Sequence, residues 1–333
     1  MLSIDVGSKK VCVVEGTYNK GIVDITDYNE IEYTSEVVVN GDIKDRSALG
    51  FLINEIIKTK NMKSKNAIVT INSTDIVARE FKLPNIKIPK LRLLVNNEML
   101  RIVGTDMEYV IDFVITSTTT DNMLMVTAYA VSKEMVENYF NLIRDLKLKP
   151  YSLDTSANCI YKLMSDSSIN GKDHNEGNII IVDIGYSHIS MHGFTNGTYR
   201  FNRTEISPFQ EFIREIGAIN RIDITSEYLS QMDVSPDFEY ENKVVTDTCK
   251  YFVYRVSEEI QRYTQYILLN STSKTVFQIY ICGGASSLKG MAPALANSLK
   301  IPVEVLESVG SVNIPANCSL SKICSAAGAL IRL

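Results

Sequence analysis

Two short segments of the sequence combine an aspartate, a glycine and small or basic residues in a way that suits phosphate and metal binding. The first contains Asp5, Gly7, Ser8, Lys9 and Lys10, and the second contains Asp183, Gly185, Tyr186 and Ser187. A turn with glycine exposes consecutive backbone N–H groups that cradle an anion. A carboxylate at the end of the preceding strand can hold a hydrated Mg²⁺ ion. Single Asp-x-Gly segments occur in plain β-turns, but two equivalent copies predict two lobes that grip one polyphosphate from opposite sides.

A third segment indicates the same kind of site. An apolar strand is predicted at 276–281, and it leads through Gly283, Gly284, Ala285 and Ser286 into a helix. Paired glycines let the backbone approach a flat ligand closely, and a helix N-terminus favours negative charge. Taken alone, this segment is better explained as an ordinary strand-to-helix turn. Together with the two Asp-x-Gly turns, it predicts a nucleotide site.

The elements that must position these residues form a weak internal repeat. Each Asp-x-Gly segment follows an apolar run typical of a β-strand, turns at its glycine and re-enters a strand. Amphipathic helices are predicted at 47–60, 208–219 and 248–269, in alternation with the strands. This alternation predicts an α/β fold.

A block with a different texture begins at Leu83 and Pro84, between the two copies of the repeat. A helix is predicted at 90–102, strands at 109–117 and 124–130, and a second helix at 133–146. The order helix, strand, strand, helix predicts an inserted αββα subdomain in the first lobe.

Composition limits the classes of partner. The chain has 333 residues, a net charge of -5 and no Lys/Arg-rich tract, which argues against nucleic acid and against direct binding to anionic lipid. None of the six cysteines forms a Cys-x-x-Cys pair, so reduced core thiols in a cytosolic protein are expected. The three histidines are too few and too dispersed to indicate a metal site.

The three glycine segments resemble the phosphate-1, phosphate-2 and adenosine motifs of the actin, DnaK-type chaperone and sugar-kinase superfamily. Within that superfamily, the order and spacing of further segments resemble the PilM family of type IV pilus assembly proteins over almost the whole chain. These segments are Leu83-Pro84, 93–98, Tyr109 with Asp112-Phe113, 128–132, 148–154, 259–262 and 327–332. The αββα block is similar to the insertion that PilM shares with the division protein FtsA.

The resemblance implies an actin-like fold of two ribonuclease-H-like lobes. It places the first lobe at 1–82 and 150–176, the insertion at 83–149 and the second lobe at 177–319, with a C-terminal helix at 320–333 packing back on the first lobe. It also implies that ATP binds between the lobes, with Mg²⁺ held by Asp5 and Asp183 through water.

Three further residues receive roles from the resemblance. Asp154 falls where an acidic or amide residue usually positions the attacking water or the metal. Glu259 and Arg262 fall where the helix of similar proteins meets ribose and adenine. An ordinary i, i+3 salt bridge on a helix surface explains Glu259 and Arg262 equally well.

The sequence departs from the family pattern at three positions. Cys12 occupies the place of a phosphate-binding lysine, for which Lys9 or Lys10 could substitute. Tyr186 replaces a small residue beside the γ-phosphate, and Asp154 is shorter than the Glu or Gln of many relatives. These departures leave nucleotide binding as the expectation and leave hydrolysis open.

The resemblance also implies a location and partners. PilM relatives act in the cytoplasm, peripherally at the inner face of the cytoplasmic membrane, where they bind the cytosolic N-terminal segment of a bitopic PilN-like protein. Other inner-membrane pilus components join the same complex, and membrane association is expected only through partners. Two alternatives remain at this point: an FtsA-like division scaffold that polymerises with ATP, and an active actin-like ATPase.

Overall fold

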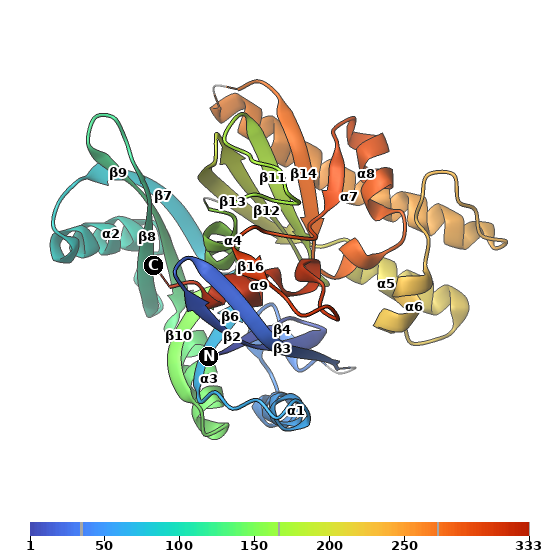
Figure 1. Ribbon diagram of the computed structural model, residues 1–333, viewed down its shortest axis with the longest axis horizontal. Helices are drawn as coiled ribbons and strands as arrows, with labels where there is room; N and C mark the ends of the chain where they lie inside the picture. Colours follow the sequence, from blue (N-terminus) through green and yellow to red (C-terminus); the bar gives the residue numbers. More distant parts are fainter. Residues whose placement is uncertain (34–35, 166, 272, 333) are drawn as a thin grey trace.

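The computed structural model describes residues 1–33, 36–165, 167–271 and 273–332, which form two lobes built on separate β-sheets (Figure 1). The first sheet has the order β10-β6-β1-β2-β3-β16. Its strands are β1 (Leu2–Val6), β2 (Lys10–Asn19), β3 (Ile22–Glu32), β6 (Asn66–Ile71), β10 (Lys149–Thr155) and β16 (Val312–Asn313). Strand β1 pairs antiparallel with β2 and parallel with β6, and β6 pairs parallel with β10.

The second sheet repeats this pattern in the order β13-β12-β11-β14-β15. Its strands are β11 (Asn178–Ile184), β12 (His188–Thr195), β13 (Thr198–Ile206), β14 (Val276–Cys282) and β15 (Val303–Val305). Strand β11 pairs antiparallel with β12 and parallel with β14, as β1 does with β2 and β6. The repeat predicted from the sequence is therefore confirmed in the topology, and the α/β class with two related lobes is correct.

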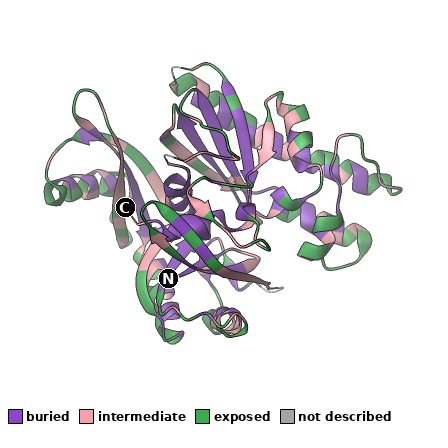
Figure 2. Cartoon of the chain, viewed as in Figure 1, coloured by how far each residue is buried: buried purple, intermediate pink, exposed green. Residues whose placement is uncertain are grey.

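Helices cover both faces of each sheet. Helices α1 (Arg46–Thr59) and α3 (Lys133–Asp145) share one core with the outer face of the first sheet. A second core lies between the second sheet and three helices, α5 (Phe209–Asn220), α7 (Lys243–Asn270) and α8 (Met291–Leu299). The short helix α6 (Ser226–Gln231) lies beside them. The buried residues in Figure 2 follow these two cores and the layer between the lobes.

Helices α4 (Ser156–Met164) and α9 (Leu320–Leu330) form the layer between the two sheets (Figure 1). They touch through small residues: a Cβ atom on Gly328 would lie only 2.1 Å from the backbone oxygen of Cys159. Only glycine permits this approach, because any side chain would force the two helices apart. The C-terminal helix thus packs back between the lobes, against β1 and β2 among others.

The inserted block contains α2 (Ile88–Val103), β8 (Tyr109–Thr118) and β9 (Met123–Ser132), followed by α3, in the order expected from the sequence. Its sheet gains a third strand, β7 (Val77–Pro84), in the order β7-β9-β8, and α2 covers this sheet with Leu91, Val95 and Met99. Helix α3 buries Tyr139 and Leu142 in the core of the first lobe instead. The packed insertion is therefore a βαββ unit at 77–132, and not the whole of 83–149.

The remaining regular segments connect these layers. They are the two-stranded hairpin β4 (Val38–Val39) and β5 (Asp42–Ile43), and the 3₁₀ turn η1 (Gly284–Ser287) after β14.

Candidate functional site

The two Asp-x-Gly segments form the same tight turn, once in each lobe. The amide N–H of Gly7 donates to the carbonyl of Lys10 at 3.0 Å, and that of Gly185 donates to the carbonyl of His188 at 2.9 Å. A Cβ atom on either glycine would lie 3.1 Å or 3.0 Å from that same carbonyl oxygen. Both turns are therefore closed so tightly that glycine fits best, and no hydrogen bond from the described part of the chain occupies the amides of the tip residues, which can face a ligand.

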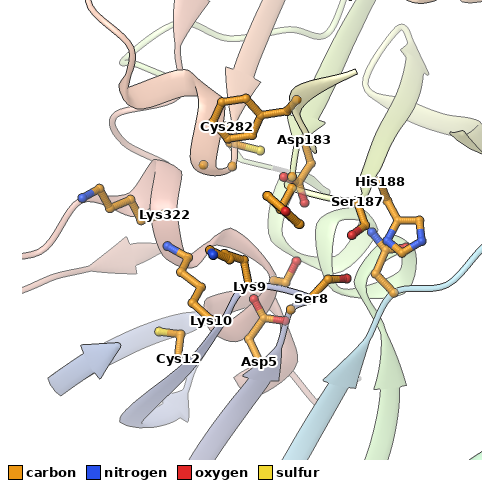
Figure 3. Close-up of a pocket in the computed structure, with 18 of the residues that line it drawn as sticks. Asp5, Ser8, Lys9, Lys10, Cys12, Asp183, Ser187, His188, Cys282 and Lys322 are labelled. Atoms are coloured by element: carbon orange, nitrogen blue, oxygen red, sulfur yellow. The ribbon is translucent and has the colours of Figure 1, made fainter. Parts of the chain in front are cut away.

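The turns face each other across one cavity of ≈ 150 Å³ between the lobes (Figure 3). The structure brings most of the predicted site residues to this cavity. They are Asp5, Gly7, Ser8, Lys9, Lys10, Asp183, Gly185, Tyr186, Ser187, Gly283 and Gly284. Residues more than 170 positions apart in the chain thus share one surface, as the repeat predicted.

Two carboxylates lie on opposite walls of the cavity. Asp5 accepts a hydrogen bond from Thr70 Oγ1 at 2.6 Å. Burial raises the pKa of Asp5, and the Thr70 hydrogen bond opposes that rise. Burial, and then the charge of Asp5, raise the pKa of Asp183 to about 7. The two acids repel each other across the cavity, so a divalent cation between them would be stabilised by both charges.

The glycine turn after β14 closes the cavity from the second lobe. Gly283 has φ 83°, and a Cβ atom there would lie 2.2 Å from Asp183 Oδ1. Its amide donates to the backbone oxygen of Ser321 at the start of α9. Ala285 and Ser286, which the sequence analysis added to the site, do not line the cavity: Ala285 lies in the second core, and Ser286 Oγ donates to the carbonyl of Gly283. Ala285 and Ser286 are buried in the second lobe, whereas Ser287, the next residue of η1, lines the cavity.

Three lysines line the cavity. Lys10 Nζ pairs with Glu30 at 2.5 Å, and Lys9 Nζ lies 5.8 Å from the centroid of the Tyr186 ring in the opposite turn. Lys322, at the start of α9, is the third. The sequence analysis missed Lys322 because nothing local marks it; only the return of the C-terminal helix places it here. Cys12 also lines the cavity.

One end of the cavity is apolar. Phe209 and Ile213 of α5 and Leu229 of α6 line it, together with the hydroxyl residues Ser226 and Ser287. Apolar walls with a few hydroxyl groups suit a flat heterocycle joined to a sugar. These residues were not predicted from the sequence. Phe209 and Ile213 belong there to the apolar face of the helix predicted at 208–219, which is typical of any core, and nothing local marks the other three.

Besides Ala285 and Ser286, three more predicted residues do not line the cavity. Asp154 accepts a hydrogen bond from Asn158 and forms an ion pair with Lys162 at 2.7 Å, in which both side chains are less than 10% exposed. Glu259 and Arg262 form the i, i+3 ion pair at 3.0 Å that was the other explanation for them. Glu259 borders a neighbouring cavity beside Tyr186, and the Arg262 side chain is 56% exposed.

The donor set fits a magnesium nucleotide. Mg²⁺ usually keeps several waters and takes one or two protein carboxylates, which Asp5 and Asp183 provide. Within the described ranges, no group of three or more His, Cys, Asp or Glu residues could hold a metal ion by itself. Among those same residues, no helix is long and apolar enough to cross a bilayer.

Comparison with known proteins identifies similar chains. The family model described as type IV pilus assembly protein PilM matches residues 3–331. Among curated proteins, no sequence matches this chain.

Solved structures share the fold over nearly the full length. A structure described as a PilM-PilN type IV pilus biogenesis complex matches with a TM-score of 0.81 at 16% identity, over 99% of this chain and 97% of that chain. The ethanolamine utilization protein EutJ from Carboxydothermus hydrogenoformans matches with a TM-score of 0.57 at 14% identity, over 98% and 88%. MreB 5 of Spiroplasma citri, bound to AMPPNP, matches with a TM-score of 0.50 at 12% identity, over 98% and 93%. At these identities the likeness establishes the actin-like fold.

Proposed function

The chain belongs to the type IV pilus assembly protein PilM family, and from this premise we propose that it is a cytoplasmic ATP-binding adaptor of the inner-membrane pilus assembly complex. The observation that carries the nucleotide part is the pair of equivalent glycine turns that face one cavity with a carboxylate on each wall. The partner part is supported by a second cavity, which lies where the insertion joins the first lobe.

Each part of the cavity matches a part of Mg-ATP. The amides of the two turns and the nearby lysines would bind the phosphates, and Asp5 and Asp183 would hold Mg²⁺ through water. The apolar end formed by Phe209 and Leu229 would take the base. Bound ATP would supply a hydrolysable phosphoanhydride. The engagement of Asp154 by Lys162 supports binding over rapid turnover, because that carboxylate is not free to orient a water.

Addition of Mg-ATP is expected to raise the melting temperature of the purified chain by several degrees. A ligand at 100 times its Kd stabilises the folded state by about 2.7 kcal/mol. Thermal unfolding at rising Mg-ATP concentration measures this effect, with a known ATP-binding protein as the positive control. An unchanged melting temperature at saturating Mg-ATP, while the positive control shifts, would contradict the nucleotide assignment.

A second cavity lies where the insertion joins the first lobe, and we will call it the junction cavity. It is lined by Asp42, Asp75, Ile76, Met107, Tyr109, Val131, Ser132, Glu134 and Met135. Its apolar side chains include Met107, which is 53% exposed, and its acidic side chains come from three different segments. An extended peptide can place apolar side chains in such a cavity and lend backbone hydrogen bonds to a sheet edge.

The charge of the junction cavity fits a segment next to a membrane. Cytoplasmic flanks of membrane-spanning helices carry an excess of Lys and Arg. The cavity carries Asp42, Asp75 and Glu134, of which Asp42 pairs with Lys44. We therefore assign the junction cavity to the cytosolic N-terminal segment of a PilN-like bitopic protein, which would hold this chain at the inner face of the membrane.

Substitution of Glu134 by lysine is expected to weaken binding of that segment about tenfold, because a repulsive charge replaces an attractive one at the cavity. Glu137→Lys is the matched control: it makes the same change one turn further along α3, on an exposed residue outside the cavity. Titration of a synthetic peptide with the N-terminal sequence of the PilN-like protein from the same organism measures both. Equal losses in the two variants would place the peptide elsewhere. No binding to the unsubstituted chain, with or without ATP, would leave the division-scaffold alternative preferred.

A further inference from the structure

The tip of the β4–β5 hairpin is held rigidly between the two cavities. Its tip residues, Asn40 and Gly41, have φ 49° and 78°. A Cβ atom on Gly41 would lie 2.7 Å from the backbone oxygen of Asn72, and the buried Tyr139 hydroxyl of α3 donates to the Gly41 carbonyl at 2.8 Å. The position of the tip is therefore fixed by close packing on β6 and α3, unlike that of an ordinary surface turn.

The side-chain amide of Asn40 contacts both lobes. Its Oδ1 lies 2.7 Å from His188 Nε2 in the second lobe, and the same oxygen accepts from the Thr74 amide at 3.0 Å. Its Nδ2 donates to Asp75 Oδ2 at 2.9 Å. His188 lines the nucleotide cavity, and Asp75 lines the junction cavity. One side chain thus joins a wall of each cavity by a direct hydrogen bond.

A second contact between the lobes lies nearby. Asn72, at the end of β6, donates through Nδ2 to Ser190 Oγ on β12 at 3.2 Å. Both contacts depend on the lobes being closed, because each joins a first-lobe asparagine to β12 of the second lobe. Opening of the lobes would separate His188 from Asn40, and Asn40 would then position Asp75 less firmly.

We propose that Asn40 couples nucleotide binding to partner binding, so that each ligand favours the closed arrangement that the other prefers. This inference rests on the proposed function and adds a regulatory link to it. A cation of the partner segment that pairs with Asp75 favours an ordered hairpin tip, and an ordered tip favours the hydrogen bond to His188. Such coupling is reciprocal by thermodynamic linkage, and each ligand raises the affinity of the other by the same factor, about fivefold or more.

The test is calorimetric titration of the full chain with the synthetic N-terminal peptide of the PilN-like protein, in the absence and presence of saturating Mg-ATP. In the unsubstituted chain, peptide affinity is expected to rise about fivefold or more with Mg-ATP. Asn40→Gly keeps the left-handed backbone and removes the amide. It is expected to bind each ligand alone, with a peptide affinity lowered a few-fold because Asp75 is held less firmly, and to lose the increase with Mg-ATP.

Asn61→Gly is the matched control, since Asn61 is also a left-handed asparagine, with φ 53°, and lines neither cavity. It should keep the full increase. Asn40→Asp serves if Asn40→Gly fails to fold: it keeps an oxygen for His188 and repels Asp75, and it should lose most of the increase. Peptide affinity that does not respond to Mg-ATP in the unsubstituted chain, or an increase that survives both Asn40 substitutions, would overturn the inference. Failure of either ligand to bind alone would instead overturn the proposed function.

Discussion

Replacement of Lys162 by methionine is expected to destabilise the folded chain by about 3 to 5 kcal/mol, which is the usual effect of leaving one member of a buried ion pair alone. Lys162 Nζ contacts Asp154 Oδ2 at 2.7 Å and donates to the backbone oxygen of Ile331 at 3.0 Å, and its side chain is 5% exposed. The substitution would leave a buried carboxylate without its cation and a buried carbonyl without its donor. Chemical denaturation at neutral pH measures the change.

A double substitution separates the charge effect from lost packing. Asp154→Asn with Lys162→Met removes both charges and keeps side chains of similar size, so it should recover most of the lost stability. Because Asp154 does not line the nucleotide cavity, the double variant should also bind Mg-ATP within about twofold of the unsubstituted chain. A loss below about 1 kcal/mol for Lys162→Met alone would show that Asp154 does not depend on this lysine, and would return Asp154 to consideration as a residue acting on water.

The turns could be predicted from the sequence because their chemistry is local. An aspartate at the end of a strand and a glycine two residues later specify a tight turn with exposed amides wherever they occur. The second Asp-x-Gly turn, which begins at Asp183, is the reason to predict that both turns belong to one site. The parallel neighbour that each strand–turn–strand unit gains, β6 in the first lobe and β14 in the second, was not part of that prediction.

The direction of a side chain could not be predicted in the same way. Asp154 is in the expected segment, at the end of β10. The buried Lys162, 8 residues further along the chain on α4, attracts its carboxylate away from the cavity. Glu259 and Arg262 form an ion pair with each other on the surface of α7. The apolar part of the cavity lining depends on how α5 and α6 fold over the second lobe, which is a long-range outcome. Local patterns identify turns, whereas tertiary packing decides which side chains meet.

The extent of the insertion also depends on tertiary packing that local sequence patterns do not predict. The change of texture at Leu83 and Pro84 predicts that the first segment of the first lobe ends at residue 82. In the structure the preceding residues pair with β9 as the strand β7, and Leu83 is buried in the core of the insertion. Helix α3 has one apolar stripe. The sequence did not indicate whether this stripe packs in the core of the first lobe or in the core of the insertion. Tyr139 and Leu142 pack in the first lobe because α1 offers Leu49 and Ile53 there.

Asp183→Asn is expected to have two opposite effects at pH 8. It should weaken Mg-ATP binding about 30- to 100-fold, since a charged contact to the hydrated metal stabilises the complex by about 2 to 3 kcal/mol. It should also stabilise the ligand-free chain by an amount on the order of 2 to 4 kcal/mol, because each pKa unit corresponds to about 1.4 kcal/mol. Burial and the charge of Asp5 raise the pKa of Asp183 from 3.8 to about 7, so the charged form opposes folding.

The pH dependence of stability tests whether the titration of Asp183 is the source of the expected gain in stability. The folded chain holds the Asp183 proton more tightly than the unfolded chain does, so the contribution of this group is fully present below pH 4 and is lost as the pH rises through about 7. Asparagine imitates the protonated form and removes that loss. The stabilisation by Asp183→Asn should therefore be large at pH 8, smaller at pH 6 and near zero at pH 4.

Denaturation at these three pH values, with calorimetric titration of Mg-ATP at pH 8, tests both effects. Asp247→Asn, which removes an exposed carboxylate on α7 far from the cavity lining, is the control and should change neither quantity. A variant that loses ATP affinity without gaining stability at pH 8 would mean that neither burial nor the charge of Asp5 makes the charged form of Asp183 costly in the ligand-free chain. A variant that gains stability but keeps its affinity would remove Asp183 from the metal site. Only the combination of both effects supports the proposal that a cation binds between the two acids, and that the chain keeps these acids close together at a cost in stability.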